Sequence, residues 1–277
     1  MRTRVAMFVL CLTFALSPLT AYAQYGVRPA SDRATGENYH VEIGGYFWNP
    51  TPDIFIASES LPGIIGDRID FIEDLGPEKT RFAQLRVVLR PATKHKFRFE
   101  YTPINYEQPN GELTRSVVFN GLLYEIGLPV ATTLNWDAYR FTYEYDIIYR
   151  DRGFFGILLE AKYTDIRAEL VNVINSEFVH ARAPIPALGV IGRVYVAPNI
   201  SITGEFSGFR LPESINEDYS AKYYDFDLYG TVNFTDHFGA QAGYRSFDVF
   251  FHINDAGELT EGQLKLKSPY FGGVVRF

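Results

Sequence analysis

Histidines next to carboxylates are the first places in this 277-residue chain to look for proton-transfer chemistry. The ordinary pKa of histidine lies near neutral pH, so a neighbouring carboxylate can make the ring a general base. His40 lies two residues before Glu42, and His252 lies close in sequence to Asp248 and Asp255. A hydrogen-bonded structural histidine explains the first spacing more simply, and we favour that interpretation for His40.

The other polar motifs give no positive case for catalysis. Ser207 and Ser246 have no partner that the sequence identifies, and we find no Gly-rich phosphate loop, paired-His zinc spacing or nucleophile elbow. Four carboxylates offer the oxygen ligands that Ca²⁺ prefers but lack the spacing and turn glycine of an EF-hand loop: Asp67, Asp70, Glu73 and Asp74. We therefore predict no enzyme activity, no metal site and no cofactor.

The first 23 residues have the three parts of a secretory signal peptide. Arg2 and Arg4 precede an apolar stretch over 5–16, and Ala21-Tyr22-Ala23 supplies the small residues before a cleavage site. Cleavage after Ala23 removes Cys11, the only cysteine, and leaves 254 residues with 24 basic and 33 acidic side chains. The mature charge of −9 argues against a nucleic-acid partner, because phosphate binding needs a basic face.

From residue 38 onward the dominant pattern is alternation of apolar and polar residues, which is the period of a β-strand. Over 139–147, for example, aromatic and aliphatic residues occupy every odd position. This pattern fits either a soluble sandwich or a membrane barrel with its apolar face toward lipid. Alternating runs longer than the about 5–6 residues of typical sandwich strands favour the barrel, as do Tyr and Phe near strand ends.

The segment 270–277 alternates in the same way and ends on a phenylalanine. It resembles the C-terminal signature of bacterial outer-membrane β-barrels, here carried by Phe271, Val275 and Phe277, with Gly273 a weak member. The resemblance implies a transmembrane antiparallel up-and-down β-barrel in a Gram-negative outer membrane. It also implies contact with membrane lipid and lipopolysaccharide, and assembly by the barrel-assembly machinery, which reads the last strand. We expect a monomer with a signal peptide (1–23), a short periplasmic lead-in (24–37) and a barrel (38–277).

Four tight connections rich in turn-forming residues predict periplasmic turns at 91–95, 151–153, 197–199 and 235–237, which leaves His95 and His237 solvated. The predicted strands are then ten, near 39–48, 81–91, 95–107, 135–150, 154–171, 185–197, 199–210, 221–235, 237–253 and 262–277. An alternative with twelve strands makes 67–74 and 113–126 span as well. Asn120-Gly121 predicts an outer hairpin, and we expect Trp48 and Trp136 at outer strand ends to join an aromatic girdle.

The same alternation predicts a charged bore. Its members are Arg86, Arg90, Arg98, Glu100, Arg140, Glu144, Asp146, Glu160, Lys162, Arg193, Glu205, Asp225, Asp227 and Arg245. With Lys96, Arg276 and Glu42 the predicted interior holds nine cations and eight anions. Such a mixture indicates a lumen mostly filled by salt-bridged side chains, as in barrels of about eight strands.

The predicted function is therefore a structural or surface role. The five long outer connections would carry it, with a combined charge of −12. A narrow porin-like channel for small solutes is the main alternative. A rim or lipid-facing hydrolase is a second one, but the sequence shows no second acidic pair to face His252 across the mouth, as outer-membrane proteases would need.

Overall fold

The computed structural model describes residues 34–58, 69–70, 74, 81–113, 115–119, 122–126, 129–171, 176–211, 219–255 and 258–277. The predicted signal peptide and residues 24–33 of the lead-in lie outside the described residues. The described chain is built of strands joined by turns and bends, and none of its elements is a helix long and apolar enough to cross a membrane.

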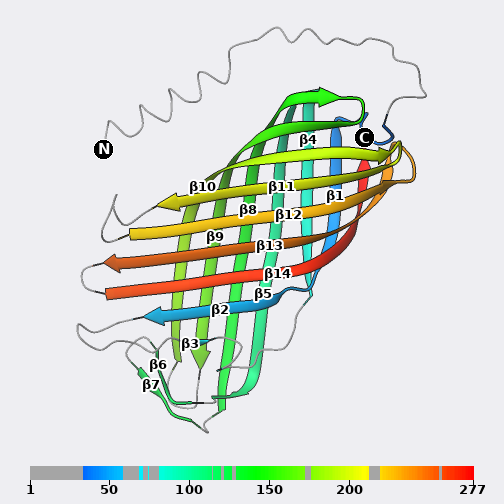
Figure 1. The fold of residues 1–277 in the computed structure, drawn as a ribbon. Coiled ribbons are helices and arrows are strands. Elements are labelled where there is room, and N and C mark those ends of the chain that lie inside the picture. Colours follow the sequence, from blue (N-terminus) through cyan, green and yellow to red (C-terminus); the bar gives the residue numbers. More distant parts are fainter. Residues whose placement is uncertain are drawn as a thin grey trace.

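Ten antiparallel strands form one closed barrel (Figure 1). Each pairs with the next, and the last strand pairs with the first, which closes the wall. The strands are β1 (Val41–Trp48), β4 (Phe82–Ala92), β5 (His95–Glu112), β8 (Pro129–Arg150), β9 (Gly153–Val171), β10 (Ser176–Ala197), β11 (Ile200–Leu211), β12 (Tyr219–Asn233), β13 (Phe238–Asp255) and β14 (Glu258–Arg276). The predicted fold class and the predicted count of ten are confirmed.

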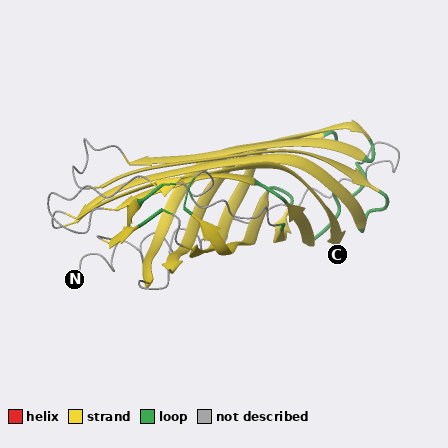
Figure 2. Cartoon of the chain, turned by 90° about the horizontal axis from the view of Figure 1, so that it is seen from below, coloured by secondary structure: helices red, strands yellow, loops and turns green. Residues whose placement is uncertain are grey.

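The four short turns lie together at one end of the barrel, which we call the turn end; the opposite end is the loop end. The turns are at 93–94, 151–152, 198–199 and 234–237, within or next to the predicted positions. From there the walls diverge, so the loop ends of β11–β14 and those of β5, β8 and β9 point in different directions (Figure 1). Seen from below, the barrel is flattened and the strands of its two broad walls cross steeply (Figure 2).

Part of the predicted outer loop 49–80 is in fact a strand. Strand β2 (Thr51–Ser58) continues β1 along the same edge of β14, and the two pair with it in one uninterrupted register. The break falls at Asn49 and Pro50, where the proline cannot donate a ladder hydrogen bond. Beyond this break β2 leaves β4 and follows β14 toward the loop end.

The twelve-strand alternative is wrong. Within 67–74 the strand that the structure describes is β3 (Ile69–Asp70), two residues that pair with β2. In the 113–126 segment, β6 (Val117–Phe119) and β7 (Leu122–Tyr124) pair as a separate hairpin, as expected; Asn120 and Gly121 themselves lie outside the described residues. None of the described residues of these two segments forms a spanning strand of the barrel.

The outer surface of the barrel near the turn end is an apolar belt. On β9 it runs through alternate exposed residues from Phe155 to Tyr163, and on β12 it runs through alternate residues from Tyr224 to Val232. These spans match the about 9–11 residues of a tilted membrane strand.

At the edge of the belt nearer the loop end, a row of tyrosines crosses the three neighbouring strands β5, β8 and β9. The ring centroids of Tyr101 and Tyr139 lie 4.9 Å apart, and those of Tyr139 and Tyr163 lie 6.3 Å apart. The prediction that Trp48 and Trp136 join an aromatic girdle is wrong, because both side chains are buried inside the barrel. Their even positions share the inward face with Glu42 and Arg140, so the period of two already implied this placement.

Candidate functional site

The bore of the barrel contains all fourteen charged residues predicted for it, every one of them buried. Lys96, Arg276 and Glu42 are buried there too. They point inward because charged residues occupy alternate positions on strands whose other face carries the apolar belt. Burial of this many charges requires partners for each, since an unpaired buried charge is strongly destabilising.

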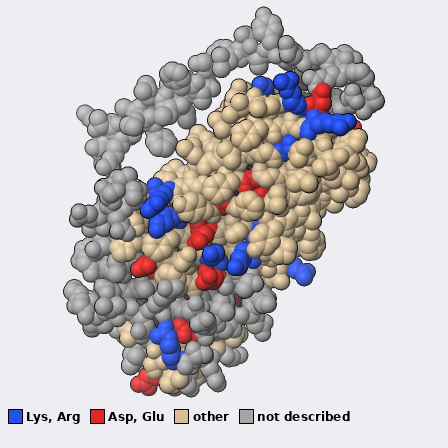
Figure 3. All heavy atoms as spheres, viewed as in Figure 1, with Lys and Arg blue, Asp and Glu red and all other residues tan. Residues whose placement is uncertain are grey.

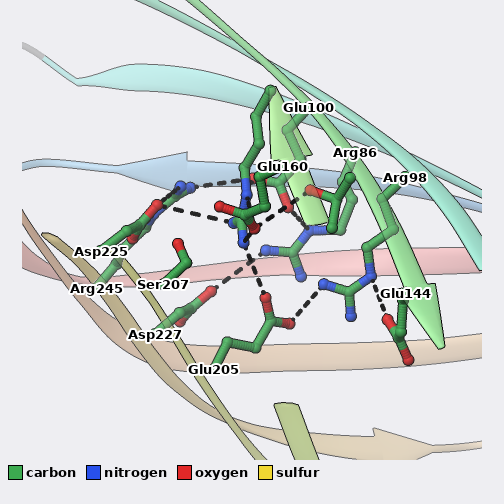
Figure 4. Close-up of polar contacts among 12 residues, drawn as sticks. Arg86, Arg98, Glu100, Glu144, Glu160, Glu205, Ser207, Asp225, Asp227 and Arg245 are labelled. Atoms are coloured by element: carbon green, nitrogen blue, oxygen red, sulfur yellow. Dashed lines mark hydrogen bonds and ion pairs between the residues drawn. The ribbon is translucent and has the colours of Figure 1, made fainter. Parts of the chain in front are cut away.

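Glu100 is the hub of the central network. Its Oε1 lies 2.9 Å from Arg86 Nε, and its Oε2 accepts from Arg140 (3.4 Å), Arg245 (3.3 Å) and Gln84 (3.2 Å). These partners come from β4, β8 and β13, so one carboxylate joins three strands across the bore (Figure 4).

Asp225 is the second hub, on β12. Arg245 donates to both of its oxygens, at 3.2 and 2.8 Å, and Lys162 Nζ lies 3.2 Å from Oδ2. Lys162 also lies 3.1 Å from Glu160 Oε2, and Arg140 donates to the other Glu160 oxygen.

Glu205 links the centre to a second group of charges nearer the turn end. It accepts from Arg98 Nη1 at 2.8 Å, and Arg98 Nε lies 2.8 Å from Glu144 Oε2 (Figure 4). Lys96 then bridges Glu144 (2.6 Å) and Asp146 (3.0 Å). Asp227 accepts from Arg86 at 3.3 Å and from the Tyr270 hydroxyl at 2.9 Å.

The turn end is covered by a strap, residues Ala34–His40. The Thr35 amide donates to the Pro198 carbonyl (2.8 Å), and the Gly36 amide donates to Asp236 Oδ1 (2.9 Å). The strap therefore touches the β10–β11 turn and the β12–β13 turn at once. Gly36 has a φ of 83°, a left-handed conformation that glycine adopts at no steric cost.

Glu37 projects from the strap into the bore and is the functional residue that our sequence reasoning missed. It accepts from Arg193 Nη1 (2.8 Å), Tyr195 Oη (2.7 Å) and Arg90 Nη1 (3.3 Å). It supplies the ninth anion of the bore, against nine cations. The sequence held one signal for this residue. The predicted bore had nine cations but only eight anions, which indicated that one more acid must come from outside the predicted strands.

The electrostatics of Glu37 follow from these contacts. Burial alone would raise the pKa of its carboxyl, but the positive charges of Arg193, Lys96 and Arg90, with the hydrogen bond from Tyr195, lower it to about 2. Glu37 thus stays ionised at any pH that the folded protein normally meets.

The loop half of the bore is filled by apolar side chains. At its base lies the aromatic cluster, which we define as Trp48, Trp136, Tyr223 and Phe247. The Phe247 ring centroid lies 5.0 Å from that of Trp136, 6.1 Å from that of Tyr223 and 6.3 Å from that of Trp48. Buried aliphatic residues continue the packing further out, including Leu134, Leu264 and Leu266.

Among the described side chains, the histidine–carboxylate pairs suggested by the sequence are not formed; the side chain of Asp255 lies outside the described ones. His40 is exposed and its Nδ1 donates to the Arg90 carbonyl (3.2 Å), whereas Glu42 forms a salt bridge with Arg276 (2.5 Å). His252 faces outward on β13, and Asp248 is held by Gln263 (3.2 Å) and Lys265 (3.8 Å). Ring atoms of His95 and His237 bond to Tyr143 and to the Arg276 carbonyl near the turns.

The acidic stretch 67–74 gives no support for a calcium site. Asp74 accepts from Arg115 at both oxygens, at 3.0 and 2.9 Å, so its carboxylate is engaged by a cation of the chain. The described residues include no group of three or more potential metal ligands. The side chains of Asp67, Asp70 and Glu73 lie outside the described residues.

Ser207, also considered above, accepts a hydrogen bond from Lys162 (3.2 Å) within the charge network.

The residues of the predicted assembly signal lie on the barrel seam. Phe271 and Phe277 are exposed on the outer surface, and Val275 pairs with Ile43 of β1 and with Phe238 of β13.

Proteins of known structure share this architecture. The outer membrane protease OmpT from Escherichia coli superposes with a TM-score of 0.60 at 8% sequence identity, over 88% of this chain and 98% of that chain. The attachment invasion locus protein Ail of Yersinia pestis gives a TM-score of 0.32 at 10% identity, over 85% and 98% of the two chains. The Pseudomonas putida toluene transporter TodX gives 0.33 at 8% identity, over 86% and 90%.

No protein-family model matches the chain, and no curated protein sequence does either. At identities this low the structural likeness concerns the fold and carries no activity from one protein to another. On the evidence of its closed ten-strand wall and the superposition with OmpT, the chain has the fold of bacterial outer-membrane β-barrels.

Proposed function

We propose that the mature chain is an integral protein of the bacterial outer membrane whose bore is closed by its own side chains. Its role is structural or lies at its outer surface, and it neither conducts solutes nor catalyses a reaction. The observation that carries this proposal is that the strap, the charge network and the aromatic cluster fill most of the bore.

Insertion in a membrane explains the apolar belt. A soluble barrel would leave these residues in water, whereas in a bilayer each buried apolar side chain contributes about 1.5–3 kcal/mol. The tyrosine row then lies at the lipid–water interface, where amphipathic rings are favoured. The short turns support a periplasmic turn end, since such barrels have short periplasmic turns and longer outer loops.

The filled bore argues against the porin-like alternative. Open aqueous channels are typical of barrels with about sixteen strands, whereas barrels near eight strands have interiors just filled by side chains. In this barrel the ten strands enclose charges that pair with one another across the bore. A conducting path would need several of these salt bridges to open together.

Lipopolysaccharide is the proposed membrane partner. It would bind a row of basic residues (the basic row) on the outer surface, on the side of the belt nearer the loop end. Its residues are Arg210, Lys222, Lys265 and Lys267, on β11, β12 and β14. Arg210 and Lys222 are direct cross-strand neighbours, and Lys267 lies level with Phe226 at the top of the belt. Clustered cations beside a membrane attract anionic headgroups. Figure 3 shows this wall as mostly tan, with blue atoms and some red ones toward its loop end.

Planar-bilayer recording of the purified protein tests the closed bore. We expect no steady unitary conductance; steady steps would favour the channel instead.

Boiled and unboiled samples on a denaturing gel test the barrel itself, because a closed barrel resists detergent unfolding and migrates differently until heated. Turnover of lipid or peptide substrates that is lost in His252→Ala would favour the hydrolase alternative.

A further inference from the structure

A β-bulge near the end of β8 decides which way its last residues face. The ladder to β9 shifts by one residue between Asp146 and Ile148, so Ile147 is an extra residue in β8. Before the bulge, the even positions of β8 face the bore. After it, Ile148 pairs with Phe155 of the apolar belt, and Arg150 follows on the same outer face. Strict alternation would have placed Arg150 in the bore, and the bulge turns it to the outer surface instead.

The bulge also exposes two adjacent isoleucines. Ile147 is 48% exposed and Ile148 is 52% exposed. They extend the apolar belt at its turn-end limit, because Phe155, where the belt begins on β9, lies directly opposite Ile148. An apolar band of this kind lies in the hydrocarbon region of a membrane. The residues just beyond the two isoleucines therefore lie at the level of the lipid headgroups.

Three exposed cations surround these isoleucines: Lys94, Arg150 and Arg152. The β4–β5 turn lies beside the end of β8, since the Asp146 amide donates to the Lys94 carbonyl (2.9 Å). Lys94 Nζ in turn donates to the carbonyl of the bulged residue, Ile147 (3.4 Å). Arg150 ends β8 and Arg152 lies in the turn that follows it. Two turns and a bulge thus bring three cations to one side of the barrel mouth.

The charge of the turn end is one-sided. The β4–β5 turn, the end of β8 and the β8–β9 turn carry the three cations against one acid, Asp151, a net charge of +2. The β10–β11 turn has no charged residue, and the β12–β13 turn carries Asp236 without a lysine or arginine. Cations at the edge of a membrane attract anionic headgroups. A headgroup without net charge gains much less from them.

We propose that a turn-end patch, which we define as Lys94, Ile147, Ile148, Arg150 and Arg152, binds an anionic phospholipid of the adjacent membrane leaflet. The lipid phosphate accepts hydrogen bonds from the three cations, and the isoleucines contact the first carbons of its acyl chains. An acidic soluble protein would match the cations but would not need isoleucines in line with the belt. The inference rests on the membrane insertion proposed above, and it adds a lipid site at the end of the belt opposite the basic row.

Quenching by labelled lipid measures which lipid lies beside the patch. The only cysteine, Cys11, lies in the predicted signal peptide, so Thr93→Cys gives the mature protein a single site for a bimane label, at the β4–β5 turn. The labelled protein is reconstituted in phosphatidylcholine vesicles that contain a minor share of phosphatidylglycerol. In parallel samples, either the phosphatidylglycerol or an equal amount of the phosphatidylcholine carries a nitroxide near the headgroup end of one acyl chain. We expect phosphatidylglycerol to quench the label several-fold more strongly than phosphatidylcholine.

A second label position is the matched control. Asn199→Cys places the bimane at an exposed position of the uncharged β10–β11 turn, at the same end of the barrel. Both lipids should quench this label equally. Replacing Lys94, Arg150 and Arg152 together by glutamine should lower the preference at residue 93 to the value at residue 199. High salt should reduce the preference as well, because it screens exposed charges.

Equal quenching by the two lipids at residue 93 overturns the proposal and leaves the patch to a soluble acidic partner. A preference that survives the triple glutamine substitution overturns it too, because the three cations would then not be its cause. If neither lipid quenches either label, membrane insertion is wrong and the lipid site fails with it. Quenching of both labels without preference supports insertion and removes only the lipid site, so the two proposals can fail separately.

Discussion

Substituting Glu37 by glutamine tests whether the strap is held by charge. The substitution keeps the size of the side chain and removes the ninth anion of the bore, leaving Arg193 and Arg90 without a counter-charge from the strap. The pKa of about 2, against an ordinary 4.5, sets the magnitude. At about 1.4 kcal/mol per pKa unit, ionised Glu37 contributes about 3 kcal/mol to the docked strap.

The sign of the pH dependence follows from the lowered pKa. A carboxyl whose folded pKa lies below its unfolded value contributes its full stability above the unfolded pKa, here 4.5. That contribution is lost as the pH falls from 4.5 to about 2. The strap should therefore loosen over this window in the original protein, whereas Glu37→Gln should already be loose at neutral pH.

Hydrogen exchange of the strap amides measures the effect. The Thr35 and Gly36 amides donate to Pro198 and Asp236, so they are protected only while the strap is docked. A loss of 3 kcal/mol corresponds to a fall in their protection of roughly a hundredfold. The matched control is Glu107→Gln, the same chemical change at an exposed position of β5, which should leave both amides unchanged.

Unaltered protection of Thr35 and Gly36 in Glu37→Gln would refute the reasoning, because the strap would then be held by its backbone contacts alone. Equal losses in Glu107→Gln would refute it as well, by showing that the effect is not local to the bore.

Three further predictions concern closure, the membrane partner and the bore charges. Gly272→Val should prevent closure and abolish heat-dependent gel migration, since a Cβ there would run into the Gly45 carbonyl of β1; Gly273→Ala, with 3.6 Å to the nearest atom, should migrate normally. Neutralising the basic row with glutamine should reduce co-purified lipopolysaccharide several-fold, whereas the same change at Lys94, Arg150 and Arg152 near the turn end should not; equal loss in both would show nonspecific attraction. Lys96→Met leaves Asp146 without the cation that holds it, while Glu144 keeps Arg98, and should cost about 3–5 kcal/mol in urea unfolding; adding Asp146→Asn should recover much of that, and no recovery would mean that the charge pairing is not the cause.

The barrel could be predicted because a barrel wall with an apolar outer face imposes one pattern on every strand. Near the turn end each residue faces either the apolar belt or the bore, so the residue type of Phe97 and Arg98, or of Phe141 and Arg140, indicates the face. The strands that were predicted too short, such as β8 and β10, extend beyond the belt. There both faces of the wall meet water or protein, and the alternation that marks a strand disappears.

The strap was beyond the sequence for a different reason. Glu37 precedes the first strand, and only the closed barrel brings it within 2.8 Å of Arg193, 156 positions later in the chain. In the same way, the hydrogen-bond partner of the Trp48 indole is the Ser268 carbonyl, 220 positions away. Local patterns carry no information about such long-range pairings.

The strap also sets a practical constraint on handling this protein. An affinity handle, spectroscopic label or protease site inserted among residues 34–40 would lift the Glu37 carboxylate out of the barrel mouth and break its anchors at Pro198 and Asp236. Insertions for surface display are better placed at the β6–β7 hairpin, which belongs to no part of the closed wall. The two ends of the barrel therefore differ for engineering. The strap at the turn end depends on the contacts of Glu37, whereas the β6–β7 hairpin pairs with no strand of the barrel wall.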